Sequence, residues 1–322
     1  MRSITSFTIA AAIAASTAVG AYTQELVRVA DPNWASGRAM AGLIKVIIEE
    51  KLGGQVELVP GTNAVIFAGM DRGKGEIDVH PDVWLPNVSN FTDEYVDKNG
   101  TVVLSNGSYD GFSAFCVPRA FAEANNIRTV FDLATPEAAA LMDRDGDGMG
   151  DIWVGAPGWA STKINSVKVR DYGITNFFTP IEAEEEVATA SISDAINKGE
   201  GYAFYCYAPH YNWLVFDMVR LEEPEYDPAK YNIKQPAEDA NWFENSRIET
   251  ADKPKKIHVG YSKSLEKRTP LVAAFLANID MDTETVSNFT HEIAVKQRLS
   301  EEVAREWINA NQEIVDGWLG LN

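Results

Sequence analysis

The chain has 322 residues, enough for one large domain or two lobes, and 45% of them are hydrophobic and 23% charged, as in soluble globular proteins. It carries 47 acidic against 28 basic residues, which gives a formal net charge of −19 at pH 7. Such a surface repels nucleic acid and anionic lipid, so we expect neither as a partner.

The first 21 residues have the pattern of a secretory signal peptide. Arg2 supplies a short basic region, residues 7–19 are mostly apolar, and residues 18–21 are small enough for cleavage. No later stretch is long and apolar enough to span a bilayer. We therefore expect a soluble mature protein that is exported to the periplasm.

Residues 25–85 alternate between strand and helix patterns. Strands are expected at 25–30, 55–60 and 75–79, a first helix ends at Gly53 and Gly54, and a second helix covers 63–72. This order predicts a parallel sheet covered by helices, with ligands beyond the carboxyl ends of its strands. Trp34 and Trp84 each follow a strand in this interpretation, so both should lie at that edge.

The rest of the chain shows the same kinds of pattern, and the order of helices and strands starts again at Arg119. The expected elements are a helix at 87–98, strands at 101–105 and 109–117, helices around Phe121 and Phe131, a strand ending at Gly155, a helix at 161–172, a helix around Ile192, strands at 201–207 and 217–221, a polar surface excursion at 222–256, a strand at 256–261, and helices at 270–279, 283–299 and 301–319. We predict a first lobe of residues 25–112 and 209–322, which includes the excursion, and an inserted second lobe of residues 113–208.

A glycine-rich turn at residues 155–162 opens into a helical pattern. Ser161 and Thr162 are good N-cap residues, and a helix start here directs the backbone N–H groups of Ala160, Ser161 and Thr162 outward. Such a start favours an anion, for example a carboxylate. Trp159 sits beside it, and the alternative is that Trp159 is a core aromatic next to an ordinary turn.

An acidic, glycine-punctuated loop precedes this turn. Its spacing matches the first ligand positions of a calcium loop, with carboxylates from Asp143, Asp145, Asp147 and Asp151 and the carbonyl of Met149. Val154 stands where such a loop has its last glutamate. We expect a structural Ca²⁺ that braces the following turn, and the alternative is a solvated acidic turn.

Motifs of common enzymes are absent from the sequence. It contains no GxSxG, Walker A, CxxC or HExxH pattern, and its four histidines are scattered. We therefore do not expect an enzyme. Cys116 and Cys206 lie in strand-like runs, where a disulfide and two buried thiols are equally compatible with the sequence.

Aromatic residues follow several expected strand ends. Trp34, Trp84, Trp159 and Tyr207 fall at such ends in both lobes. A quaternary ammonium has no N–H to donate, so hydrogen bonds cannot hold it, whereas aromatic faces attract it by about 0.5–2 kcal/mol each. The four residues together suggest a cage for such a cation, although any one alone could be packing.

These residues resemble the substrate-binding proteins of ABC importers for glycine betaine and related compatible solutes. The resemblance rests on three stretches: the acidic loop followed by Gly-x-Pro-Gly-Trp at 143–159, the strand end Tyr207-Ala-Pro-His210 followed by Leu-Glu-x-Pro at 221–224, and the terminal pattern at 307–318. It implies an α/β, two-lobed periplasmic binding protein of type II with its ligand in the interlobe cleft.

The resemblance also implies roles for single residues. Trp84 and Trp159 match cage tryptophans of the family, and Tyr207 stands where a Trp is usual. The backbone N–H groups of Ala160 and Ser161 match the donors to the ligand carboxylate. His210 belongs to the matching strand end and is expected at the ligand site, and Trp34 is added from its own position. Val88 replaces a carboxylate-binding His of some members.

The function implied is capture of glycine betaine or a related quaternary-ammonium or sulfonium solute by a monomer, and its delivery to an ABC permease with a separate ATPase subunit. Trimethylamine N-oxide and dimethylsulfoniopropionate stay open as ligands. A sensor subunit is the rival binding role. An exported enzyme on choline-like substrates and a calcium-dependent structural protein are rivals of other classes.

Overall fold

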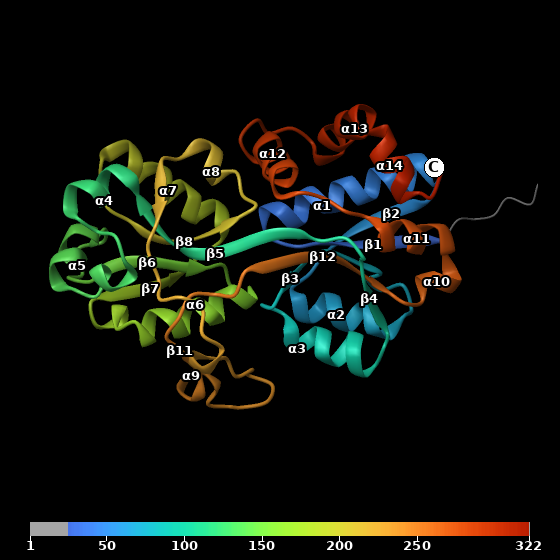
Figure 1. Ribbon diagram of the computed structural model, residues 1–322. Coiled ribbons are helices and arrows are strands. Elements are labelled where there is room, and N and C mark those ends of the chain that lie inside the picture. Colours follow the sequence, from blue (N-terminus) through green and yellow to red (C-terminus); the bar gives the residue numbers. More distant parts are fainter. Residues whose placement is uncertain (1–24, 322) are drawn as a thin grey trace, which may run out of the picture.

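The computed structural model describes residues 25–321 of the chain (Figure 1). The expected signal peptide at residues 1–21 lies outside the described residues. Figure 1 shows two α/β lobes side by side, with β5 (Tyr109–Pro118) and β12 (Lys255–Ser262) running between them. The two-lobed α/β architecture expected from the sequence is confirmed. Between residues 25 and 321, no helix is long and apolar enough to cross a membrane.

One mixed sheet runs through both lobes. Its strand order is β2-β1-β3-β12-β5-β8-β6-β7, with β4 beside β12 and β9 beside β5. The strands are β1 (Leu26–Asp31), β2 (Gln55–Pro60), β3 (Val79–Leu85) and β4 (Val102–Leu104) in the first lobe, and β6 (Gly150–Gly155), β7 (Phe178–Glu182), β8 (Ala203–Ala208) and β9 (Met218–Arg220) in the second. β1 pairs parallel with β2 and β6 with β7, whereas β12 pairs antiparallel with β3.

Helices cover this sheet on both faces (Figure 1). Those of the first lobe are α1 (Ala35–Val46) with η1 (Ile47–Lys51), α2 (Asn63–Arg72), α3 (Ser89–Thr92) with η2 (Asp93–Lys98), α10 (Leu265–Arg268), α11 (Pro270–Asn278), α12 (Thr283–Ala294), α13 (Ser300–Ala310) and α14 (Gln312–Trp318). Those of the second lobe are α4 (Arg119–Asn125), η3 (Val130–Leu133), α5 (Pro136–Met142), α6 (Ala160–Asp171), η4 (Ile174–Asn176), α7 (Glu185–Lys198) and α8 (Asn212–Val215). Met40, Leu43 and Ile44 of α1 and Ile47 of η1 recur at helical spacing and are fully buried, so this face packs in the core.

The prediction for the third strand is wrong in its bounds. The strand was expected at 75–79 with Trp84 after it, but β3 begins at Val79 and contains Trp84. The intervening His80, Pro81 and Asp82 suggest a loop, because strands seldom hold such residues. Here β3 is buried along most of its length, and Asp82 is fully supplied with hydrogen-bond donors.

In the second lobe, several elements differ from the sequence-based predictions, and the state of the two cysteines is settled. Helix α5 and strand β7 were not expected from the sequence. Helix α6 begins at Ala160 with Trp159 as its N-cap residue, so the expected N-caps Ser161 and Thr162 lie inside its first turn. Cys116 and Cys206 form a disulfide with an S–S distance of 2.08 Å, which joins β5 to β8 and excludes two free thiols.

The polar excursion contains short elements of its own. They are η5 (Pro228–Lys230), β10 (Tyr231–Asn232), α9 (Trp242–Asn245) and β11 (Arg247–Ile248). Ile248 packs in a small cluster with Ile164 and Val167 of α6. The excursion was expected to belong to the first lobe, but its apolar contacts are with this helix of the second lobe. Strand β9 likewise pairs with the second-lobe half of β5.

Candidate functional site

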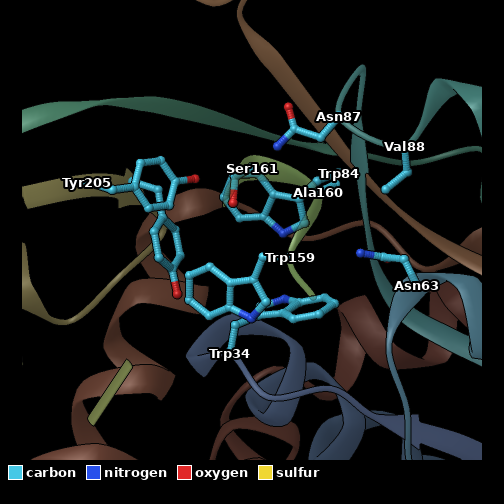
Figure 2. A pocket seen from close by; sticks show the side chains of 10 residues that line it. Trp34, Asn63, Trp84, Asn87, Val88, Trp159, Ala160, Ser161 and Tyr205 are labelled. Carbon is cyan, nitrogen blue, oxygen red and sulfur yellow. The ribbon is translucent and has the colours of Figure 1, made fainter. Parts of the chain in front are cut away.

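A pocket lined by aromatic and amide side chains lies between the two lobes (Figure 2). The first lobe supplies residues from β1–α1, α2 and β3–α3, and the second supplies residues from the start of α6 and from β8. The lining residues are Trp34, Asn63, Trp84, Asn87, Val88, Trp159, Ala160, Ser161, Tyr205 and Tyr207. Six of the seven ligand-site residues expected from the sequence are therefore brought together, from segments far apart in the chain.

Four aromatic rings of this pocket, those of Trp34, Trp84, Trp159 and Tyr207, include three pairs that stand nearly at right angles. The planes of Trp84 and Tyr207 meet at 85° with ring centroids 5.5 Å apart. Trp159 stands at 87° to Tyr207 and at 85° to Trp34, with centroid distances of 5.9 and 6.3 Å. Perpendicular rings form the walls of a box, and a cation inside it faces several π surfaces at once.

A buried carboxylate behind the box holds two of its walls. Asp82 Oδ2 accepts hydrogen bonds from Trp34 Nε1 at 2.6 Å and from Trp84 Nε1 at 2.8 Å. It also accepts from Ser36 Oγ at 2.7 Å, and Asp82 Oδ1 accepts from the hydroxyl of Tyr109. Burial raises the pKa of Asp82, and the four hydrogen bonds oppose that shift. Since an indole N–H can only donate, Asp82 fixes the orientation of the rings of Trp34 and Trp84.

Two residues of the site, Asp82 and Tyr205, were not predicted from the sequence. No sequence pattern places Asp82 at the site, because a single aspartate does not stand out in a chain with a net charge of −19. Tyr205 could have been predicted, because it lies two residues before Tyr207 on β8, and residues at that spacing point to the same face of a strand. Its ring stacks against Tyr207 at 5.6 Å, and its hydroxyl lies 3.1 Å from Ser113 Oγ.

The start of α6, where hydrogen-bond donors to the ligand were expected, forms part of the pocket wall. No side chain caps this helix, and its first two residues, Ala160 and Ser161, both line the pocket. The turn before it depends on two glycines: Gly155 and Gly158 have φ of +132° and +83°, which residues with a Cβ rarely adopt. Backbone N–H groups at an uncapped helix start favour an anionic ligand group.

His210 does not line the pocket. It lies behind the wall formed by Tyr207, with the two ring centroids 4.8 Å apart. Its Nδ1 accepts from the backbone N–H of Asn212 at 3.0 Å, so its Nε2 carries the proton that it donates to Glu185 Oε1, also at 3.0 Å. Unlike the other six residues expected at the ligand, His210 therefore contacts Glu185 and is not part of the pocket lining.

The two lobes contact each other directly beside the pocket. Trp159 Nε1 of the second lobe donates to Asn33 Oδ1 of the first at 2.8 Å. Three consecutive glutamates at the start of α7 then contact the start of α1. Glu184 accepts from the amide of Asn33, Glu185 from the backbone N–H of Ala35, and Glu186 from Arg38.

The acidic loop gathers three of its four aspartates. Carboxylate oxygens of Asp143, Asp145 and Asp147 lie within 4.8 Å of one another, and of the three residues Asp143 is half-buried and the other two are exposed. Asp151 is not one of this group of three, and it accepts a hydrogen bond from the backbone N–H of Arg144 at 3.0 Å. Burial raises the pKa of Asp151, the hydrogen bond from Arg144 opposes the shift, and the neighbouring aspartates add to it. Oxygen donors at this spacing suit a hard cation such as Ca²⁺.

Comparison with known proteins gives consistent results. A family model described as the substrate binding domain of ABC-type glycine betaine transport systems matches residues 25–310. A glycine betaine/proline betaine-binding periplasmic protein of Salmonella typhimurium is 22% identical over 231 residues, which cover 67% of this chain and 65% of that protein. The match thus spans less than two thirds of the relative's length.

Solved structures share the fold at low sequence identity. A lactococcal protein in a closed form complexed with glycine betaine superposes with a TM-score of 0.69 at 19% identity, over 92% of this chain and 99% of that one. An ABC-transporter choline-binding protein in complex with choline gives a TM-score of 0.71 at 17% identity, over 92% and 91%. A glycine betaine/L-proline-binding protein of Borrelia burgdorferi gives 0.71 at 16%, over 91% and 96%.

Proposed function

The chain belongs to the family of substrate-binding domains of ABC-type glycine betaine transport systems, and from this we propose that it captures a small betaine-like solute between its lobes. The bound form docks on an ABC permease, whose ATPase is a separate chain, and the solute passes to the cell interior. The protein acts in the periplasm as a monomer, and it binds its ligand without changing it chemically.

The observation that carries this proposal is the aromatic box itself. Five rings from two lobes line one pocket, and the carboxylate of Asp82 lies directly behind two of them. A trimethylammonium group cannot donate a hydrogen bond, but it is attracted by π faces and by a nearby negative charge. Because the walls come from both lobes, a ligand inside the box favours the closed arrangement.

The ligand proposed is glycine betaine or a related quaternary-ammonium or sulfonium solute. Its cationic head would occupy the box, and its anionic end would accept from the backbone N–H groups of Ala160 and Ser161. The uncapped start of α6 supports this orientation. Trimethylamine N-oxide has no carboxylate, so a preference for it would keep the box but remove this role of α6.

A structural Ca²⁺ in the acidic loop is part of the same proposal. It would bind to Asp143, Asp145 and Asp147, with the carbonyl of Met149 and with Asp151 directly or through water. The clustering of three carboxylates supports it, because such groups repel one another without a cation. The ion would stabilise the turn before Trp159 and take no part in ligand chemistry.

Calorimetric titration of the calcium-replete protein tests the proposal. The panel comprises glycine betaine, proline betaine, carnitine, choline, dimethylsulfoniopropionate and trimethylamine N-oxide. We expect one zwitterion to bind with a Kd of about 1 μM or below, near −8 kcal/mol, and to be recovered unchanged after long incubation. No binding across the panel by a folded protein would refute the proposal, and chemical turnover would replace it with an enzymatic function.

A further inference from the structure

Two asparagine side chains line the pocket beside the start of α6. Asn63 is the first residue of α2 and is nine-tenths buried, and Asn87 follows β3 and is half-buried. In each of them the side-chain oxygen is engaged by a partner outside the pocket. Among the described residues, no acceptor contacts the side-chain nitrogen of either one. Both side-chain nitrogens therefore face the pocket.

The orientation of the Asn63 amide is fixed by His80. The backbone N–H of Asp82 donates to His80 Nδ1 at 3.2 Å, so that nitrogen must be unprotonated. The proton of the neutral ring then lies on Nε2, which is 2.8 Å from Asn63 Oδ1. Burial lowers the pKa of His80 to about 3, which keeps the ring neutral at physiological pH. An N–H donor at this contact requires the oxygen of Asn63, and its nitrogen points the other way.

The orientation of the Asn87 amide is fixed by Lys255. This lysine is fully buried, and its Nζ lies 2.6 Å from Asn87 Oδ1 and 3.3 Å from Asp252 Oδ2. An ammonium group has only donors, so the atom of Asn87 that faces it must be the oxygen. Figure 2 shows the resulting arrangement, in which the nitrogens of Asn63 and Asn87 point into the pocket.

Asp252 explains how Lys255 is kept as a donor. Burial raises the pKa of Asp252, but Lys168, Lys255 and the hydrogen bond from the Tyr231 hydroxyl together outweigh this effect, so the pKa is lowered and the carboxylate stays ionised. Burial lowers the pKa of Lys255, and Asp252 opposes that shift. An ionised carboxylate 3.3 Å away needs a donor, which Lys255 supplies. The ion pair and the amide contact therefore stabilise one another.

We propose that Asn63 and Asn87 are specificity-determining residues whose amide N–H groups, with those of Ala160 and Ser161, bind the carboxylate of a zwitterionic ligand. This rests on the function proposed above and narrows it: the site selects a betaine over choline, which has the same cationic head but a neutral hydroxyl at the other end. Several donors oriented in advance stabilise a carboxylate more strongly than a hydroxyl. His80 and Lys255 are positioning residues, since they act through the two amides.

Replacement by aspartate separates this role from a structural one. In Asn63→Asp and Asn87→Asp, one carboxylate oxygen still accepts from His80 or Lys255, while the inward donor becomes an acceptor. At pH 8 we expect each change to weaken glycine betaine binding by about 100-fold, because like charges are brought together. Choline binding should change by less than about threefold, since its hydroxyl can donate to the new oxygen. Asn90→Asp adds the same charge on α3, outside the pocket lining, and should leave both affinities unchanged.

The outcomes distinguish this inference from the proposed function. If the wild-type protein binds glycine betaine but both aspartate variants retain its affinity within about threefold, the inference is wrong and the proposed function stands. If the wild-type protein binds choline as tightly as glycine betaine, the inference is also wrong. If the folded wild-type protein binds neither compound nor any other of the panel, the proposed function itself fails. Thermal unfolding and near-UV circular dichroism of each variant verify that the fold is retained.

Discussion

Glu185 of the second lobe accepts a hydrogen bond from the backbone N–H of Ala35 in the first lobe, with 3.0 Å between Oε2 and the nitrogen. Ala35 begins α1, and no side chain from its own lobe caps that helix. The other carboxylate oxygen accepts from the hydroxyl of Tyr207 and from His210. One buried carboxylate thus caps a helix across the cleft and holds a wall of the aromatic box, so it couples closure to the shape of the pocket.

The first prediction concerns this coupling. In Glu185→Gln the negative charge at the start of α1 is lost and one acceptor oxygen becomes a donor. A helix cap contributes about 1 kcal/mol, so we expect the Kd for glycine betaine to rise by about fivefold to tenfold. Small-angle scattering of the ligand-free protein should show a more open average shape. The neighbouring Glu186→Gln removes only an exposed ion pair with Arg38 and should change the Kd by less than about threefold. Equal effects of the two variants would contradict the role of Glu185.

The second prediction concerns the box. Trp159 contacts the rings of Trp34, Tyr205 and Tyr207, and it is the N-cap residue of α6. Trp159→Ala removes a wall of the box and the bond to Asn33, so binding should weaken by about 100-fold or more in calorimetry. Trp242→Ala removes a half-buried tryptophan of the excursion and should leave the affinity unchanged. Wild-type affinity in Trp159→Ala would refute the assignment of the box.

The third prediction concerns the pH dependence of stability. His80 has a pKa of about 3 in the folded protein, below its ordinary value of 6.5 because of burial. As pH falls through 6.5, the unfolded chain takes up a proton that the folded chain does not, so the free energy of unfolding falls. Between pH 8 and pH 5 this amounts to about 2 kcal/mol. Urea unfolding at both pH values should show this loss in the wild-type protein and a smaller loss in His80→Gln. Equal losses in the two proteins would show that His80 does not titrate as expected.

The sequence predicted those parts of the site that depend on local pattern. Trp34 follows a strand and Trp159 follows a glycine turn, and both local arrangements bring their rings to the pocket. Contacts between distant segments were not predictable in the same way. Asp82 is important because two indoles from different segments donate to it, and Asn87 because a lysine 168 residues away fixes its amide. No pattern within either segment predicts these partners.

The bounds of β3 and the position of His210 both depend on contacts that the local sequence pattern does not show. His80 and Asp82 look like loop residues until the groups that satisfy them in the buried strand are known. His210 follows a strand that carries cage aromatics, so it was expected at the ligand, but its ring lies behind Tyr207 and contacts Glu185. Tyr205 is the opposite case, since the period of two along β8 would have placed it beside Tyr207.

The last prediction concerns the acidic loop. If Ca²⁺ binds there, it binds the folded chain in preference to the unfolded one and raises the melting temperature. At about 100 times the Kd, the gain of about 2.7 kcal/mol corresponds to roughly 5 °C for a chain of this length. Chelation should reverse the shift, and Mg²⁺ should not reproduce it, because Mg²⁺ demands a stricter octahedral geometry. Asp145→Asn removes a carboxylate of the cluster and should abolish the shift, whereas Asp97→Asn, which changes an exposed aspartate outside the loop, should keep it.

No shift of the melting temperature in the wild-type protein would leave the loop as a solvated acidic turn, held by its own backbone contacts such as the 2.7 Å hydrogen bond from Gly146 N to Asp143 Oδ1. Binding of betaine would be unaffected by that result, because the aromatic box and the loop share no residue.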